Sequence, residues 1–331
     1  MSQIIRPATP EDIPQLVKLL LQDAKQRQAA DGVLWKLAPD ASAQIETALI
    51  AALTSEQQPF RQIWQVADEA GRISGVVHSM LLPVPPIYAG ADGAPGLILP
   101  DSFAAPEACD GTVDALIAAA EAALRDAGAR IILSSYVTGE DWRQALQRRG
   151  YAPLTLYLSR TGLDKAGPAA GVRPALETDV ADIVRLSAEN RQILFEIDPF
   201  WAPHPDADRR FAGWMRRSLT FDDRDMMVMG PPEELTGYTI AQPASRLHFP
   251  PAHDISGTGV LDDYVHRELA NPAALANGGR GATLLLRAAE AAFAKRGIDA
   301  AFVVCPAHWQ SKVEMLQAAG YETAMVWSIK R

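Results

Sequence analysis

The strongest constraint on this chain is an internal repeat with a nearly constant spacing. Matching landmarks recur in the same order at spacings of 162 to 170 positions: Arg6 as Arg173, Asp12 as Asp179, Gly75 as Gly237, and Gly150-Tyr151 as Gly320-Tyr321. One such match can arise by chance. Several matches in order predict that one fold is written twice.

The join between the two copies is a stretch of small residues with a proline, 165–171. We therefore predict a first domain over residues 1–164, a linker over 165–171 and a second domain over residues 172–331. In each copy the hydrophobic periodicity predicts one strand, two helices, three strands, and then a helix, a strand, a helix and a strand. This order predicts an α/β fold, with a mixed sheet flanked by helices in each domain.

Composition excludes several classes of protein. The 331 residues carry a net charge of −9, which argues against nucleic acid or an anionic membrane as a partner. The two cysteines are too few for a disulfide framework, and no apolar run reaches the roughly 18 residues that cross a bilayer. We expect a cytoplasmic protein and leave its oligomeric state open.

A glycine-rich turn at residues 277–285 is the clearest candidate binding motif. It follows a predicted strand over residues 260–265 and opens a predicted helix that runs to about Arg296. Backbone N–H groups at a helix start, with the helix dipole behind them, bind phosphate. The turn has no Gly-Lys-Ser/Thr ending and no third glycine at dinucleotide spacing, so it is neither a Walker loop nor a dinucleotide fingerprint.

The remaining pattern, Gly-x-Gly-x-x-Leu-Leu from Gly279 to Leu285, resembles the pyrophosphate loop of the GCN5-related N-acetyltransferases. With the Arg-Pro-Ala…Asp opening and the closing Gly-Tyr, the chain is similar to the tandem two-domain form of this family. The resemblance implies two acyl-CoA N-acyltransferase-like domains, acetyl-CoA as co-substrate and a small amine as acceptor. The acetyl-CoA-binding residues that it implies are Tyr264, Val265, Gly278, Gly279, Arg280, Gly281, Ala282 and Thr283, with the backbone near Val265 bonding the thioester carbonyl.

The corresponding turn of the first half departs from this pattern. Gly111 is kept, but Val113 stands where Gly281 does, and Asp110 and Asp114 add negative charge. A side chain obstructs close approach to the backbone, and each carboxylate repels pyrophosphate. We expect the first domain to be degenerate and the second to hold acetyl-CoA. Ala276 replaces the Arg or Gln that begins the family motif. Arg280 is the candidate for the missing positive charge, and the alternative is a solvated surface arginine.

Acetyl transfer needs a base for the amine and an acid for the leaving thiolate. Asp262 and Asp263, on the predicted fourth strand, are the candidate bases; the alternative is that they solvate the edge of the strand. Side chains alternate along a strand, so the two should face opposite ways. The family's acid, a tyrosine on the last helix, is Leu316 here, which leaves Cys305 and His308 as the nearest substitutes by sequence. The alternative for Cys305 is to pack in the core as a small hydrophobic residue.

The acceptor site implied by this fold lies between the first two helices of the second half. There Phe195, Glu196 and Trp201 offer aromatic faces and a carboxylate for an amine, or else pack onto the core. The histidines lack metal-ligand spacing, so we expect no metal. Two functions follow: an N-acetyltransferase that acts through its second domain, or a catalytically inactive CoA-binding module with a regulatory or structural role.

Overall fold

The structure is a computed structural model that describes residues 3–55, 60–137, 140–163 and 170–331. Most of the predicted linker, residues 164–169, lies outside this range. We call residues 3–161 the first half and residues 172–330 the second half. Within the described residues no helix is both long enough and apolar enough to span a membrane.

The two halves contain the same elements in the same order. The first half has β1 (Gln3–Pro7), α1 (Ile13–Ala30), α2 (Ala41–Thr54), β2 (Gln62–Glu69), β3 (Arg72–Leu81), β4 (Gly96–Ile98), β5 (Phe103–Ala104), α3 (Thr112–Asp126), β6 (Ile132–Tyr136), α4 (Glu140–Arg148) and β7 (Ala152–Thr161). The second half has β8 (Val172–Pro174), α5 (Val180–Ile197), α6 (Ala207–Ser218), β9 (Asp225–Met229), β10 (Gly237–Pro243), β11 (Thr258–Leu261), β12 (Tyr264–His266), α7 (Arg280–Lys295), β13 (Ala300–Pro306), α8 (Gln310–Ala318) and β14 (Glu322–Lys330). The predicted mixed α/β fold is confirmed.

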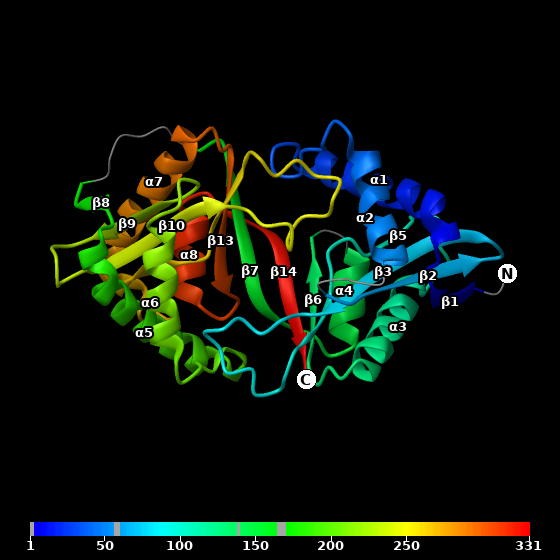
Figure 1. Ribbon diagram of the computed structural model, residues 1–331, viewed down its shortest axis with the longest axis horizontal. Helices are drawn as coiled ribbons and strands as arrows, with labels where there is room; N and C mark the ends of the chain where they lie inside the picture. Colours follow the sequence, from blue (N-terminus) through cyan, green and yellow to red (C-terminus); the bar gives the residue numbers. More distant parts are fainter. Residues whose placement is uncertain (1–2, 56–59, 138–139, 164–169) are drawn as a thin grey trace.

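Each half places its last strand beside the other half. The strands form one continuous sheet in the order β1-β2-β3-β4-β6-β14-β7-β13-β11-β10-β9-β8, with β5 on β3 and β12 on β10. Thus β14 lies between β6 and β7, and β7 lies between β14 and β13 (Figure 1). The pairs β4–β6 and β11–β13 are parallel, and the other pairs are antiparallel. The exchange joins the halves through backbone hydrogen bonds.

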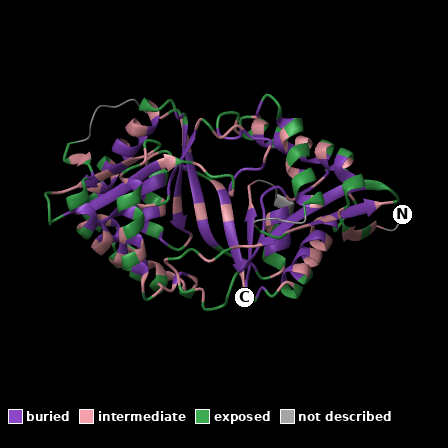
Figure 2. Ribbon diagram, in the orientation of Figure 1, coloured by how far each residue is buried: buried purple, intermediate pink, exposed green. Residues whose placement is uncertain are grey.

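Helices cover both faces of the sheet because strand residues alternate between two apolar faces. In the first half Val66 and Val76 pack with α1 and α2, whereas Ala67 and Val77 pack with α3 and α4. In the second half one cluster of buried side chains joins α5 and α6 to β9 and β10, and another joins α7 and α8 to β11 and β13. Figure 2 shows the buried strands and the exposed outer faces of the helices.

Two long loops also reach across the junction. Loop 82–95, between β3 and β4, contacts the second half, where the Ala89 N–H donates to the Ala202 carbonyl at 2.7 Å. Loop 244–257, between β10 and β11, contacts the first half, where the Ala38 N–H donates to the Ala252 carbonyl at 2.9 Å. Each half thus closes one side of the space between them.

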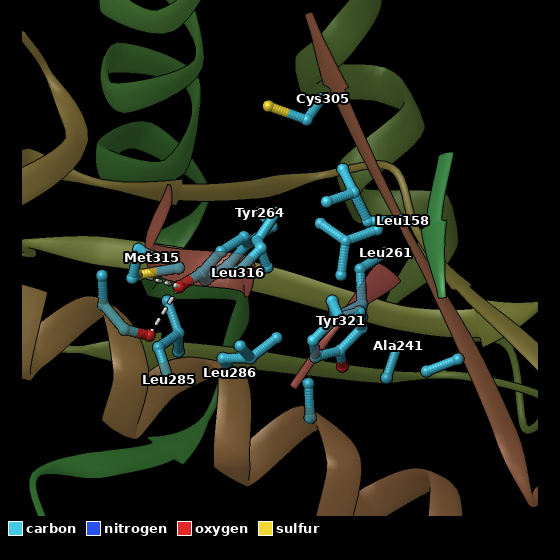
Figure 3. Close-up of a cluster of buried hydrophobic side chains, with 14 of the residues drawn as sticks. Leu158, Ala241, Leu261, Tyr264, Leu285, Leu286, Cys305, Met315, Leu316 and Tyr321 are labelled. Carbon is cyan, nitrogen blue, oxygen red and sulfur yellow. Dashed lines mark hydrogen bonds between the residues drawn. The ribbon is translucent and has the colours of Figure 1, made fainter. Parts of the chain in front are cut away.

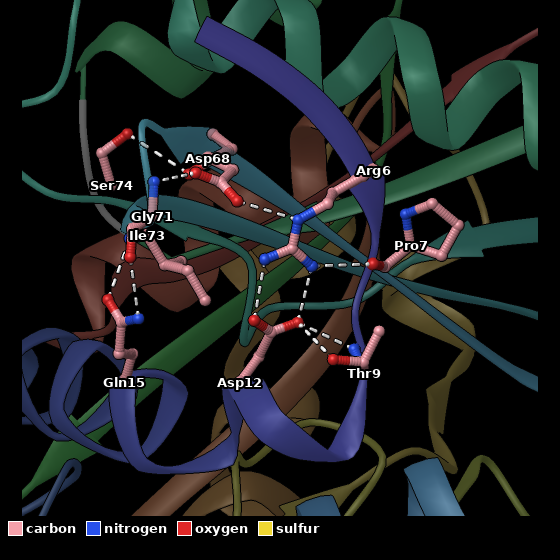
Figure 4. A network of polar contacts seen from close by, with 10 residues as sticks. Arg6, Pro7, Thr9, Asp12, Gln15, Asp68, Gly71, Ile73 and Ser74 are labelled. Carbon is pink, nitrogen blue, oxygen red and sulfur yellow. Dashed lines mark hydrogen bonds and ion pairs between the residues drawn. The ribbon is translucent and has the colours of Figure 1, made fainter.

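The Arg-Pro…Asp landmark makes the same structure in both halves. Asp12 accepts two guanidinium hydrogen bonds from Arg6, at 2.7 and 2.8 Å, and one from the Thr9 N–H at 2.8 Å (Figure 4). Asp179 accepts two from Arg173, both at 2.7 Å. The aspartate therefore ties the first strand to the start of the first helix. This contact explains why the two residues recur at a fixed spacing.

Candidate functional site

A cavity of about 1350 Å³ lies between the two halves. Its wall includes both crossing loops, the exchanged strands and the break in the fourth strand of each half. Most of the lining is apolar, with aromatic rings from both halves: Trp64, Tyr88, Tyr157, Trp201, Phe249 and Trp327. The cavity is larger than the roughly 300–1000 Å³ of ordinary ligand sites.

The predicted strand over residues 260–265 is interrupted where its two aspartates lie. β11 ends at Leu261 and pairs with β13, whereas β12 begins at Tyr264 and, among the described strands, pairs with β10 alone. Asp262 and Asp263 fill the break, and both line the cavity. The expectation that their side chains face opposite ways stays a prediction, because strict alternation requires a continuous strand.

The two aspartates differ in their surroundings. Asp263 accepts a hydrogen bond from the Tyr238 hydroxyl at 3.1 Å and is partly buried. The Asp262 side chain is exposed to the cavity, although protein surrounds the cavity. Loss of hydration raises the pKa of Asp262 to about 6, and the negative charge of Asp263 adds to this shift. Burial also raises the pKa of Asp263. Asp262 is therefore a carboxylate that can take up a proton near neutral pH.

Lys312 is a functional candidate that the sequence analysis missed. It lies on α8, is 4% exposed, and donates to the Tyr264 carbonyl at 3.0 Å. Burial lowers its pKa, whereas Asp263 and Asp262 act in the opposite direction. Tyr88, from the loop of the first half, also lies near the two aspartates. Burial raises the pKa of Tyr88, and the negative charges of Asp263 and Asp262 raise it further. A lysine in an otherwise apolar helix face was the one available signal in the sequence.

The glycine loop has the geometry of an anion site. Asn277, Gly278 and Gly279 have φ of 48°, 63° and 66°, so three successive residues are left-handed before α7 begins at Arg280. Such a turn directs backbone N–H groups toward one point at the helix N-terminus. The side chain of Arg280 is exposed beside the loop.

The chain's own carboxylate occupies part of this site. Glu268 accepts the Ala282 N–H at 3.1 Å, and its Oε2 lies 3.5 Å from Nδ1 of His266. A Cβ on Gly281 would lie 2.6 Å from His266 Cε1 and 3.2 Å from Glu268 Oε2. The missing side chain at Gly281 therefore makes room for these two residues.

Side chains from α8 and from the residue before it lie against the gap between β12 and β13. Trp309 donates from its indole to the Leu269 carbonyl at 2.9 Å, and Lys312 lies beside it. The Tyr264 hydroxyl donates to the Ala282 carbonyl at 2.6 Å and contacts Met315 (Figure 3). A pocket of about 30 Å³ lies between α5 and β12, whereas the large cavity reaches Tyr264 on β12 and Val304 on β13.

The backbone of β12 has one side free of strand pairing. The Arg267 N–H donates to Thr236 and the Asp263 carbonyl accepts from Ile240, so these positions face β10. Alternation then turns the peptide groups of Val265 toward β10 and those of Tyr264 toward the gap. The predicted thioester contact near Val265 stays a prediction, and Tyr264 has the better orientation for it.

The other predicted site residues are scattered. Trp201 is 8% exposed and lines the cavity, whereas Phe195 and Glu196 are exposed and are absent from its lining. His308 is exposed outside the lining, and burial raises the pKa of Cys305 to about 12. The roles of Phe195, Glu196 and His308 stay predictions. Cys305 is 0% exposed, which is the position of a core residue.

Solved structures resemble the whole chain. A GCN5-related N-acetyltransferase from Sphaerobacter thermophilus is similar with a TM-score of 0.58 and 14% identity, over 99% of this chain and 95% of that one. A tandem GNAT protein from the clavulanic acid biosynthesis pathway, solved without AcCoA, is similar with a TM-score of 0.52 and 14% identity, over 99% and 98%. This chain has the fold of the GCN5-related N-acetyltransferases. No protein-family model and no curated protein sequence matches it. At 14% identity the likeness concerns the fold, so activity has to be argued from the site.

Proposed function

We propose that this protein is an N-acyltransferase that moves an acetyl group from acetyl-CoA to a small amine, with its reacting centre in the second half. The observation that carries this proposal is Asp262, a carboxylate with a pKa raised to about 6 at the break of the fourth strand, open to a large cavity. A base with a pKa near the working pH is efficient at removing a proton from an amine. Cytoplasmic location stays an expectation.

The roles follow from the positions. The acceptor enters through the cavity as an ammonium and loses a proton to Asp262, directly or through water, and the neutral nitrogen then attacks the thioester carbon. The carbon–sulfur bond then breaks, and CoA leaves as the thiol after taking up a proton. Lys312 lies one helical turn before Leu316, the position of the missing tyrosine, and its lowered pKa suits it to supply that proton.

Acetyl-CoA would lie with its pyrophosphate on the left-handed turn before α7. The loop geometry fits this group, and Arg280 supplies a positive charge beside it. The Glu268 carboxylate has to leave the Ala282 N–H, and the Trp309 end of α8 has to move from the gap beside β12.

One observation favours a second candidate, a ligand-binding protein without acyl transfer. Glu268 occupies an N–H group of the turn that the co-substrate needs, and Trp309 is tied to Leu269 beside β12, both through hydrogen bonds of ordinary length. On this second hypothesis the cavity alone is functional.

Two measurements separate the candidates. Titration calorimetry with acetyl-CoA should give one site per chain, because the first-half turn lacks the run of left-handed residues. Release of free CoA thiol should then depend on added amine and on Asp262. Absence of heat with acetyl-CoA, or thiol release that no amine stimulates, would favour the second candidate.

A further inference from the structure

The first half places a histidine–aspartate pair at the wall of the same cavity. His78 on β3 has its Nδ1 at 2.8 and 3.0 Å from the two carboxylate oxygens of Asp101. Asp101 lies between β4 and β5, where the first half breaks its own fourth strand. The side chains are 9% and 8% exposed, so water competes little for either group.

The other imidazole nitrogen of His78 has no hydrogen-bond partner among the described residues. The residue lines the cavity, and its ring stacks on Trp64 with centroids 3.8 Å apart and planes 14° apart. A buried polar atom without a partner costs free energy, which a bound ligand can recover. The stacking fixes the ring, so the free nitrogen has one orientation.

The partner of Nδ1 decides what the free nitrogen can bind. An ionised carboxylate only accepts hydrogen bonds, so in the neutral imidazole the proton lies on Nδ1. Nε2 then carries a lone pair that no described residue uses, and it is buried at the wall of the cavity. It can accept a hydrogen bond from a ligand and cannot donate one.

The rest of the wall has matching properties. Five aspartates and two basic side chains are among the described residues that line the cavity, and most of the remainder is aliphatic, proline or aromatic. Burial lowers the pKa of His248 to about 4, so this residue adds no positive charge at neutral pH. Asp262 lies in the second-half part of the wall and His78 in the first-half part.

We propose that the cavity binds an elongated amine with a large apolar body and a second hydrogen-bond donor at its far end. Its ammonium group lies at Asp262, and the second donor bonds Nε2 of His78, which is a positioning residue. The identity of this ligand as the acyl acceptor rests on the proposed function. Its binding does not, because it needs no CoA.

The test measures binding to the full chain at pH 8 without CoA, by quenching of the tryptophan fluorescence and by calorimetry. The probes are 1,10-diaminodecane, decylamine and decanoic acid. We expect the diamine to bind about tenfold more tightly than decylamine, because hydrogen bonds to charged groups are the stronger kind. Decanoic acid should bind most weakly, since the wall is acidic.

Two variants identify the His78 contact. Asp101→Asn keeps the shape but offers an N–H to Nδ1, which turns Nε2 into a donor that an ammonium cannot satisfy. His78→Phe keeps a ring against Trp64 and has no nitrogen. Both should bring diamine affinity down to that of decylamine, while decylamine affinity stays unchanged and thereby reports an intact cavity.

Several results would overturn the proposal. They are equal binding of the two amines by the unchanged protein, a diamine preference that survives both variants, tighter binding of decanoic acid than of decylamine, and no binding of any probe. Amine binding without acetyl-CoA-dependent thiol release would instead leave the site in place and remove the proposed function.

Discussion

The two halves each place an aspartate at the break of their fourth strand, and they surround it differently. In the first half Asp101 is paired with His78. In the second half Asp263 accepts a hydrogen bond from the Tyr238 hydroxyl, and Asp262 lies beside it in the sequence. The Asp101 carboxylate orients the His78 ring. In the second half Asp263 bonds Tyr238, and the Asp262 carboxylate is left open to the cavity. One fold thus gives a polar anchor in one half and a proton acceptor in the other.

The helix that follows shows a second difference. In the first half a single left-handed residue, Gly111, precedes α3, whereas three precede α7. Each helix start also has a glutamate nearby: Glu69 accepts the Cys109 N–H at 3.2 Å, and Glu268 accepts the Ala282 N–H. The second half alone has the full anion-binding turn, and there the glutamate bonds within the first turn of the helix.

The largest expected effect is at Asp262. Asp262→Asn keeps the shape and removes the basicity, so kcat should fall by about 10²–10⁴-fold while the affinity for acetyl-CoA stays nearly unchanged. The measurement is thiol release at saturating amine, with calorimetry for the co-substrate. The matched variant Asp263→Asn should retain much more activity, because Asp263 already bonds Tyr238.

Full activity in Asp262→Asn at saturating amine would contradict this assignment. The amine would then enter already neutral, and the site would work by positioning the thioester. A larger loss in Asp263→Asn than in Asp262→Asn would exchange the two roles.

The pH profile gives the next largest effect. A base must be ionised to work, so kcat/KM should fall about tenfold per pH unit as the pH drops below the raised pKa of Asp262, about 6. This acidic limb should disappear in Asp262→Asn and persist in His78→Phe. A limb that persists in Asp262→Asn would assign the titration to another group.

The repeat and the fold class were predictable from the sequence, because Arg6, Asp12 and their counterparts make local contacts that any copy of the fold needs. The exchange of β7 and β14 was not. Both strands have similar apolar alternation, and alternation says which face is buried but leaves the neighbouring strand open.

The candidate site was predicted only where its residues are close in sequence. Asp262 and Asp263 were found because two acids within a predicted strand are unusual. The pair His78–Asp101 was missed because 23 positions separate its members, although a histidine inside the buried strand β3 was a visible signal. The contact of Glu268 with Ala282, 14 positions apart, depends on the short helix after β12, which periodicity does not reveal.

A smaller effect should follow from removing the glutamate at α7. Glu268→Gln removes a negative charge beside the turn and weakens its hold on the Ala282 N–H, so the affinity for acetyl-CoA should rise about tenfold. Calorimetry checks this, and Glu69→Gln in the first half is the control that should change nothing. An affinity that falls or stays constant in Glu268→Gln would place the pyrophosphate elsewhere.

The contacts of His266 and Glu268 also change the interpretation of Gly281, which the sequence analysis explained by access of pyrophosphate to the backbone. A valine there would collide with His266 before it met a phosphate, so the substitution tests the packing of this pair rather than access for the co-substrate. Glu268→Gln is the sharper experiment because it leaves the backbone of the turn unaltered.

The smallest effect concerns the arginines that open the two halves. Arg6 bonds Asp12 with two nitrogens and Asp68 with a third at 2.9 Å, whereas Arg173 bonds only Asp179 among the carboxylates of the described residues. Arg6→Ala should therefore lower the free energy of unfolding by about 1–2 kcal/mol and Arg173→Ala by about 1 kcal/mol, since two-pronged pairs to a shielded carboxylate exceed ordinary surface pairs. Urea denaturation at pH 7 measures both.

The pH dependence of these losses identifies their cause. Arg6 lowers the pKa of Asp12, and Arg173 lowers that of Asp179. Each pair therefore contributes its full stability above the ordinary aspartate pKa of about 4. This contribution is lost as the pH falls through the lowered pKa. The difference between each variant and the unchanged protein should thus shrink in strong acid. Arg185→Ala, which breaks more exposed pairs on α5, should cost less than either at pH 7. Suppose that Arg173→Ala and Arg185→Ala lower the free energy of unfolding equally. The Arg–Asp pair shared by the halves would then stabilise the fold no more than an ordinary surface pair. Apolar packing alone would hold the first strand against the first helix.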